Sequence, residues 1–140
     1  MQKDGPIIII EDDTDDQDFF RELLQIIECP NVPLFFTEGS AVLDYLNKGE
    51  GQPFLIFSDL NLPRTNGVDL RREMKASDNL QIKCLPFIYY TGTPSFKIGL
   101  EAYGDCIQGF FIKPARLEEG ARVLKNIISY WKDSYYPELN

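Results

Sequence analysis

The sequence predicts an α/β protein in which a doubly wound parallel sheet is covered by helices on both faces. Short apolar segments alternate with amphipathic segments along the chain, and each apolar segment is nearly continuous. Strands that are buried on both faces produce this pattern, whereas half-exposed strands alternate apolar and polar residues. The length of 140 residues fits one domain with a single sizeable core.

Five short apolar runs predict the strands of this sheet. Each run is too short for a helix and is rich in β-branched or aromatic residues. The runs cover residues 7–10, 34–36, 54–57, 86–90 and 109–112.

The segments between these runs carry apolar residues at helical spacing. Residues 19–27 place their apolar side chains on one face, and Thr14 with Gln17 predicts a capping box at the start of that helix. Residues 117–131 form a second clear stripe, with acidic residues in the first turn, where the helix dipole favours them. Three further helices are predicted near residues 41–46, 68–75 and 95–103.

The composition excludes several functions. The net charge of -8, from 14 basic and 22 acidic residues, argues against binding to nucleic acid or to an anionic membrane surface. No apolar run approaches the roughly 18 residues of a membrane span, and the start MQKDGPIIIIEDD is unlike a signal peptide. We therefore expect a cytoplasmic protein that binds neither nucleic acid nor membrane.

Histidine is absent, and cysteine is sparse. Without histidine the chain cannot supply its own phosphohistidine or build a Ser-His or Cys-His nucleophile pair. Cys29, Cys84 and Cys106 are odd in number and lack a CxxC pattern. Neither a disulfide framework nor a zinc site is therefore expected.

Chemically active residues follow the predicted strands. Glu11 and Asp12 come after the first strand, Asp59 after the third, Thr91 after the fourth and Lys113 after the fifth. Ligands of doubly wound folds bind at this edge of the sheet. Crowded carboxylates raise one another's pKa unless a cation lies among them, and a hard divalent ion such as Mg²⁺ prefers such oxygen ligands.

Asp59 is the candidate nucleophile of this cluster. A carboxylate can take a phosphoryl group as an aspartyl phosphate. A metal ion and Lys113 would offset the charge on the transferred oxygens, and Thr91 could donate a hydrogen bond to one of them. The buried strand before Asp59 would hold its carboxylate rigidly at the open edge of the sheet.

Four segments, IIIIEDD, FSDLNLPRTNG, IYYTG and FFIKP, occur in the order and spacing of receiver domains of two-component response regulators. The chain resembles this family over essentially its whole length. The resemblance implies a flavodoxin-like receiver fold with the strand order 2-1-3-4-5. It also implies a single receiver domain over residues 1–140, with a core of about residues 5–131 and a C-terminal tail at 132–140.

The resemblance also assigns site residues. Asp59 would be the phosphoacceptor, and Lys113 would bind the phosphoryl group. The implied cofactor is Mg²⁺ (or Mn²⁺), with Glu11, Asp12, Asp59 and the backbone carbonyl of Asn61 as its ligands.

A conformational switch is implied as well. Thr91 would be the switch hydroxyl and Phe110 the switch aromatic residue, and the Lys113–Pro114 peptide bond would be cis. Phosphorylation would reshape a protein-binding surface formed by the fourth predicted helix, the fifth strand and the fifth helix.

The implied function is phosphorelay signal transduction. A sensor histidine kinase or a histidine phosphotransfer protein would donate the phosphoryl group, and a downstream protein target would recognise the switched surface. The segments DLNLPRTNG and IISYWKDSYYPELN resemble stand-alone regulators that serve phytochrome-type histidine kinases. Trp131, Tyr135 and Tyr136 suit either packing on the domain or a symmetric homodimer contact.

Two alternative functions are weighed against a phosphorylated receiver. The chain could be a pseudo-receiver that is never phosphorylated and acts as a constitutive protein-binding scaffold. An aspartate-nucleophile phosphatase would carry DxD at the nucleophile, but Asn61 supplies an amide at the second position.

The other acidic residues near the first strand have a simpler interpretation. They are expected to be solvent-exposed residues that the helix dipole favours. They are Asp13, Asp15, Asp16 and Asp18.

Overall fold

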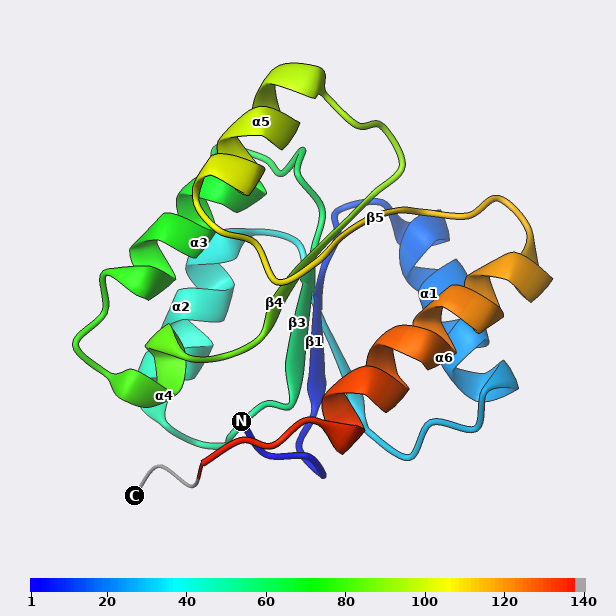
Figure 1. Cartoon of the computed structure of the whole chain (residues 1–140), viewed down its shortest axis with the longest axis horizontal. Helices are drawn as coiled ribbons and strands as arrows, with labels where there is room; N and C mark the ends of the chain where they lie inside the picture. Colours follow the sequence, from blue (N-terminus) through cyan, green and yellow to red (C-terminus); the bar gives the residue numbers. More distant parts are fainter. Residues whose placement is uncertain (138–140) are drawn as a thin grey trace.

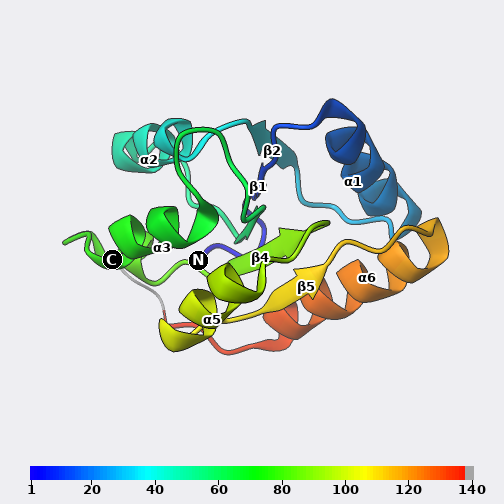
Figure 2. The same ribbon diagram turned by 90° about the horizontal axis from the view of Figure 1, so that it is seen from above.

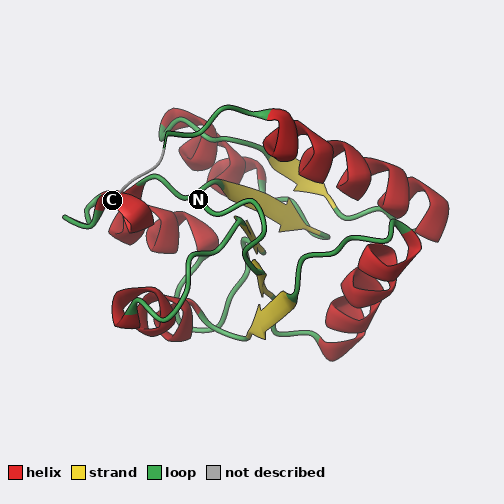
Figure 3. Cartoon of the chain, turned by 90° about the horizontal axis from the view of Figure 1, so that it is seen from below, coloured by secondary structure: helices red, strands yellow, loops and turns green. Residues whose placement is uncertain are grey.

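The computed structural model describes residues 1–137 and contains one parallel sheet of five strands in the order β2-β1-β3-β4-β5. The doubly wound class predicted from the sequence and the strand order implied by the resemblance are both confirmed. Figure 3 shows the strands lying between layers of helices. The strands are β1 (Ile7–Ile10), β2 (Pro33–Phe36), β3 (Leu55–Ser58), β4 (Phe87–Thr91) and β5 (Phe110–Ile112).

Helices cover both faces of the sheet (Figure 1, Figure 2). The first and last helices pack together on one face, and the other helices lie on the opposite face. The helices are α1 (Thr14–Ile26), α2 (Gly39–Lys48), α3 (Gly67–Lys75), α4 (Leu80–Lys83), α5 (Phe96–Gly104) and α6 (Leu117–Asp133).

Each strand divides its side chains between two hydrophobic clusters. Successive residues of a strand point to opposite faces, so Ile8 and Ile10 enter the cluster under α2 to α5, whereas Ile7 and Ile9 enter the cluster under α1 and α6. Because β1 and β3 are buried on both sides, the residues at their carboxyl ends are held in fixed positions.

The start of α1 differs from the predicted capping box. Asp13, not Thr14, is the N-cap, and its Oδ1 accepts hydrogen bonds from the backbone N–H groups of Asp15 at 2.8 Å and Asp16 at 3.1 Å. An aspartate oxygen is a strong acceptor for these free N–H groups. The side chain of Gln17 instead donates to the backbone carbonyl of Glu11 at 2.6 Å.

Two further features differ from the expectation. The short helix α4, capped by Asn79, was not predicted, because four residues are too few to show an apolar period. The Lys113–Pro114 bond is trans, since no peptide bond among the described residues is cis. Trans is the ordinary isomer for such bonds, favoured by roughly 0.5–1 kcal/mol.

The C-terminal aromatic residues behave in three ways. Trp131 packs against the hydrophobic cluster under α1 and α6. The hydroxyl of Tyr136 donates to the backbone carbonyl of Cys84 at 3.4 Å, while Tyr135 is 89% exposed. Residues 138–140 of the predicted tail lie outside the described residues. Over residues 1–137, no helix combines the length and apolar character needed to cross a membrane.

Candidate functional site

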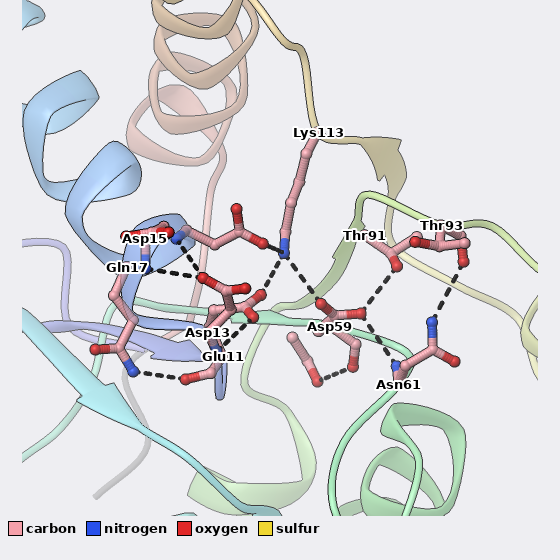
Figure 4. Close-up of polar contacts among 11 residues, drawn as sticks. Glu11, Asp13, Asp15, Gln17, Asp59, Asn61, Thr91, Thr93 and Lys113 are labelled. Carbon is pink, nitrogen blue, oxygen red and sulfur yellow. Dashed lines mark hydrogen bonds and ion pairs between the residues drawn. The ribbon is translucent and has the colours of Figure 1, made fainter.

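The carboxyl ends of four strands bring the predicted active residues together (Figure 4). Glu11 follows β1, Asp59 follows β3, Thr91 ends β4 and Lys113 follows β5. Glu11, Asp59 and Thr91 are buried, although all three are polar. Buried polar groups need partners, and these residues supply one another's.

The two carboxylate oxygens of Asp59 have different partners. Oδ1 accepts a hydrogen bond from the Thr91 hydroxyl at 2.9 Å and another from the backbone N–H of Asn61 at 3.1 Å. Oδ2 accepts from the ammonium group of Lys113 at 3.0 Å. These contacts fix the orientation of a carboxylate that is only 9% exposed.

Lys113 lies at the centre of three acids. Its ammonium donates to Glu11 Oε2, to Asp59 Oδ2 at 3.0 Å and to Asp16 Oδ2 at 3.1 Å. An ammonium has three N–H donors, so each carboxylate takes one. The Lys113 side chain is 14% exposed, which makes these ion pairs less screened than surface pairs.

Burial and charge act differently on the two buried acids. Burial raises the pKa of Glu11 to about 7, although its hydrogen bond to Lys113 opposes the rise. Burial also acts to raise the pKa of Asp59, but the N–H of Asn61, a hydrogen bond with Glu11 and the charge of Lys113 outweigh it. The pKa of Asp59 is therefore lowered, and this carboxylate is ionised at neutral pH.

Lys113 remains a cation at this site. Burial acts to lower its pKa, but the hydrogen bonds and charges of Glu11 and Asp59 outweigh that effect and raise the pKa. The arrangement at neutral pH is therefore an ionised carboxylate, Asp59, beside a permanent positive charge.

The predicted metal ligands are only partly brought together. Glu11 and Asp59 face each other across the Lys113 ammonium, while Asp12 is exposed and has no paired side chain within residues 1–137. Over the same residues, no three Asp, Glu, His or Cys side chains group as a metal-ligand cluster. The side chain of Asn61 donates to the backbone carbonyl of Thr93 at 3.3 Å.

Asp16 is a site residue that the sequence reasoning missed. It was expected to be one of several solvated acids at a helix start, but it is the third acid on Lys113. Asp15 and Asp18 look the same in sequence, and Asp18 pairs with Arg21 at 2.8 Å on the surface. The only available signal was that α1 begins directly beyond the carboxyl end of β1.

The loop after β3 packs closely under Asp59. A Cβ atom at Gly67 would lie 2.6 Å from the backbone carbonyl oxygen of Asp59 and 3.1 Å from the Ser58 hydroxyl oxygen. Only glycine allows this approach. Asn66 then caps α3 by accepting from the N–H of Asp69 at 2.9 Å, which anchors the far end of the loop.

The predicted switch aromatic residue lies in a row of rings that leads to the surface. Phe110 is half-buried, with its ring centre 5.9 Å from that of Tyr89 and 6.2 Å from that of Tyr103, on which it stacks. Tyr103 lies on α5 and is 65% exposed. Tyr89 precedes Thr91 by two residues on β4, so both side chains leave the same face of the strand.

Comparison with known families identifies the kind of domain. The model of the response regulator receiver domain matches residues 7–125, which include every predicted site residue. The chain belongs to this family. Receiver domains are signalling modules that interact with histidine kinases or phosphotransfer proteins and bind a divalent metal ion.

Two curated regulatory proteins are similar to this chain. The probable methanogenesis regulatory protein FilR2 of Methanothrix harundinacea is 31% identical over 98 residues, which span 67% of this chain and 62% of that protein. This chain therefore covers less than two thirds of FilR2. The response regulator Rcp1 of Synechocystis sp. strain PCC 6803 is 24% identical over 133 residues, spanning 91% of this chain and 89% of Rcp1.

Solved receiver structures share the fold. The phosphorylated cyanobacterial phytochrome response regulator RcpA superposes with a TM-score of 0.82 at 22% identity, covering 95% of this chain and 98% of that one. The Mn²⁺-bound form of Rcp1 superposes with a TM-score of 0.77 at 22% identity, with the same coverage.

Proposed function

We propose that this receiver is a phosphorylation switch in which Asp59 accepts a phosphoryl group from a sensor histidine kinase or a histidine phosphotransfer protein. The observation that carries the proposal is the state of Asp59: a buried, ionised carboxylate at a strand end, oriented by Thr91 and Asn61 and paired with Lys113. A single domain of about residues 5–131 would perform this function, with residues 132–140 as a C-terminal extension.

The donor chemistry of the site fits a divalent cation. Glu11 and Asp59 are two buried carboxylates that share a single ammonium. That ammonium does not fully offset the burial of Glu11, because the pKa of Glu11 is still raised. Hard carboxylate and carbonyl oxygens are the ligands that Mg²⁺ and Mn²⁺ prefer. Glu11, Asp12, Asp59 and the backbone carbonyl of Asn61 would hold the ion. When bound, it supplies positive charge that offsets the charge of the phosphoryl oxygens.

Side chains of this protein would carry out the phosphoryl transfer. A carboxylate oxygen of Asp59 attacks the phosphorus of the phosphohistidine, and an O–P bond forms as the N–P bond to the donor breaks. The histidine nitrogen keeps the electron pair of the broken bond. Lys113, already 3.0 Å from Asp59, lies close enough to pair with an oxygen of the transferred group.

Thr91 would carry the signal away from the site. Its hydroxyl donates to Asp59 in this structure and can donate to a phosphoryl oxygen instead. Such a movement of Thr91 would change the space beside Tyr89 and Phe110, which contact each other in the aromatic row. The row ends at α5, where Phe96, Leu100 and Tyr103 are exposed.

This exposed surface of α5, together with β5 and α6, is the proposed output. A downstream protein target or a second copy of the chain would bind there. The exposed apolar side chains favour a protein partner, because large exposed apolar residues on one helix are typical of interaction sites.

A phosphodonor tests the proposal. The protein is incubated with Mg²⁺ and acetyl phosphate, and its intact mass is measured beside the Asp59→Asn variant, with size-exclusion chromatography of the same samples. We expect one added phosphoryl group on the wild type and none on the variant. A folded wild type that gains no phosphoryl group would instead support the constitutive scaffold.

A further inference from the structure

Asp16 is the third acid on Lys113, and it is not one of the ligands proposed for the divalent ion. Its Oδ2 accepts a hydrogen bond from the Lys113 ammonium at 3.1 Å. The other two acids on this ammonium, Glu11 and Asp59, each have a place in the proposed metal site. The phosphoryl transfer described above gives Asp16 no role.

The first turn of α1 fixes the position of Asp16. Its backbone N–H donates to Oδ1 of Asp13, the N-cap of the helix, at 3.1 Å. The next residue, Gln17, donates from its side chain to the backbone carbonyl of Glu11 at 2.6 Å. These bonds tie the start of the helix to the end of β1. The carboxylate of Asp16 therefore belongs to a rigid part of the fold.

Lys113 reaches this carboxylate from the outer strand of the sheet. Three strand spacings, about 14 Å, separate β5 from β1. The Lys113 side chain therefore extends over the strand ends to meet Glu11 (Figure 4). An extended lysine side chain gives up rotamer freedom, so it stays extended only while acceptors hold its ammonium.

The three acceptors differ in burial. The exposed fraction of the side chain is 5% for Glu11, 11% for Asp59 and 46% for Asp16. Because Asp16 keeps contact with water, its pairing with Lys113 carries a small desolvation cost. A divalent ion would engage Glu11 and Asp59 and repel the ammonium. Asp16 would then be the acceptor that holds Lys113 at the site.

We propose that Asp16 is a positioning residue, which keeps the Lys113 ammonium beside Asp59 when a divalent ion occupies the site. The inference rests on the proposed function, because it concerns the positive charge that Lys113 supplies to the transferred phosphoryl group. Asp16 acts through Lys113 and does not touch the reacting atoms. Without Asp16, the ammonium moves toward solvent when the ion binds.

Two variants of the full chain, altered within one helical turn, test this role. Asp16→Asn removes the charge that pairs with Lys113. Asp15→Asn removes the same charge one residue earlier, from an exposed side chain that is not among the ion-pair partners of Lys113 within residues 1–137. The backbone N–H groups of both residues donate to Asp13, so the helix cap is common to the two variants. A difference between them reports on the contact with Lys113 and not on net charge.

The first readout is the Lys113 side chain itself, observed without phosphodonor. NMR of the lysine ε-methylene group separates a fixed ammonium from a mobile one, and the Lys113 signal is assigned by its absence from Lys113→Arg. At saturating Mg²⁺, the two ε-protons should keep separate chemical shifts in the wild type and in Asp15→Asn. They should merge toward one shift in Asp16→Asn.

The second readout is the rate of phosphorylation by acetyl phosphate. At saturating Mg²⁺ the rate should fall about three- to tenfold in Asp16→Asn, because a displaced ammonium no longer offsets the phosphoryl charge. Asp15→Asn should keep the wild-type rate within about twofold. The half-saturating concentration of Mg²⁺ should rise by a similar factor in both variants, because each loses one negative charge near the ion.

Equal Lys113 spectra in the wild type and in Asp16→Asn would overturn the positioning role. Equal rates in Asp16→Asn and Asp15→Asn would overturn its effect on phosphorylation. A wild-type spectrum that does not respond to Mg²⁺ would overturn the inference together with the metal site. Failure of phosphorylation looks different: the wild type then gains no phosphoryl group, while the spectra, recorded without phosphodonor, still decide whether Asp16 holds Lys113.

Discussion

The two faces of the sheet make different use of the same strand ends. On the face of α1 and α6, the strand ends meet charged groups and a cavity: Asp16 reaches Lys113, and Tyr90 borders the open space. On the opposite face they meet packed rings, with Phe110 between Tyr89 and Tyr103. The first face places charged groups around a cavity, and the second places packed rings that reach the surface at Tyr103.

Asp59 joins the two faces through its two oxygens. Oδ2 is paired with Lys113, in the charged cluster, whereas Oδ1 is bonded to Thr91, on the side of β4 that carries Tyr89. A group added to this carboxylate would change the contacts of both residues at once. The coupling proposed between the site and α5 therefore needs no long pathway, because the Asp59 side chain contacts both systems.

The largest effect on stability is expected from the charged face. Lys113→Ala removes the ammonium shared by three acids and leaves Glu11 and Asp59 buried without a cation. We expect the free energy of unfolding in metal-free buffer to fall by about 2–4 kcal/mol, as measured by urea denaturation. Excess Mg²⁺ should restore part of the loss.

The control for this variant is Lys125→Ala, which removes an exposed lysine from α6. It should change the free energy of unfolding by less than about 0.5 kcal/mol. Equal losses in the two variants would show that the ion cluster contributes nothing beyond an ordinary surface charge.

A smaller effect on the same face should appear as a pH dependence. Burial raises the pKa of Glu11 from 4.5 to about 7, so the folded protein binds this proton more tightly than the unfolded chain does. Stability in metal-free buffer should therefore fall as pH rises from about 4.5 to about 7. The lowered pKa of Asp59 acts at lower pH and in the opposite direction.

Glu11→Gln tests the origin of this slope. The neutral amide removes the titration, so we expect the decline over that interval, roughly 1–2 kcal/mol in the wild type after solvent screening, to disappear. Urea denaturation at about pH 4.5 and at about pH 7 measures this change in the free energy of unfolding. A slope that survives in Glu11→Gln would assign it to another group.

The smallest effect should be alike on the two faces. Tyr89 and Tyr90 are adjacent, both are buried, and neither hydroxyl has a partner within residues 1–137. Tyr89→Phe and Tyr90→Phe each remove a buried hydroxyl without a partner, so each should raise the free energy of unfolding by about 0.5–1 kcal/mol. Thermal denaturation measures both gains. A loss of stability in either variant would show that its hydroxyl is satisfied in the folded protein.

Much of the candidate site could be predicted from the sequence, because the ends of parallel strands must meet at one edge. That rule places Glu11, Asp59, Thr91 and Lys113 together before any coordinates are known. It cannot separate Asp16 from its acidic neighbours, because only the position of the first turn of α1 decides which acid reaches Lys113.

The cavity and the aromatic row were harder to predict. Tyr89 and Tyr90 lie within an apolar strand and have no sequence feature that separates a residue packed among rings from one that lines a cavity. The stacking of Phe110 on Tyr103 depends on how α5 lies against β5. Both features come from packing between elements, which local patterns do not encode.

The most direct test of the coupling follows α5 itself. Hydrogen exchange of the amides of Phe96–Gly104 is measured before and after treatment with acetyl phosphate and Mg²⁺, in the wild type and in Thr91→Val, which removes only the hydroxyl bonded to Asp59. Intact mass confirms that both proteins carry the phosphoryl group. We predict that exchange in α5 changes on phosphorylation of the wild type and stays constant in the variant. An equal change in phosphorylated Thr91→Val would contradict the role of Thr91 as the link between Asp59 and α5.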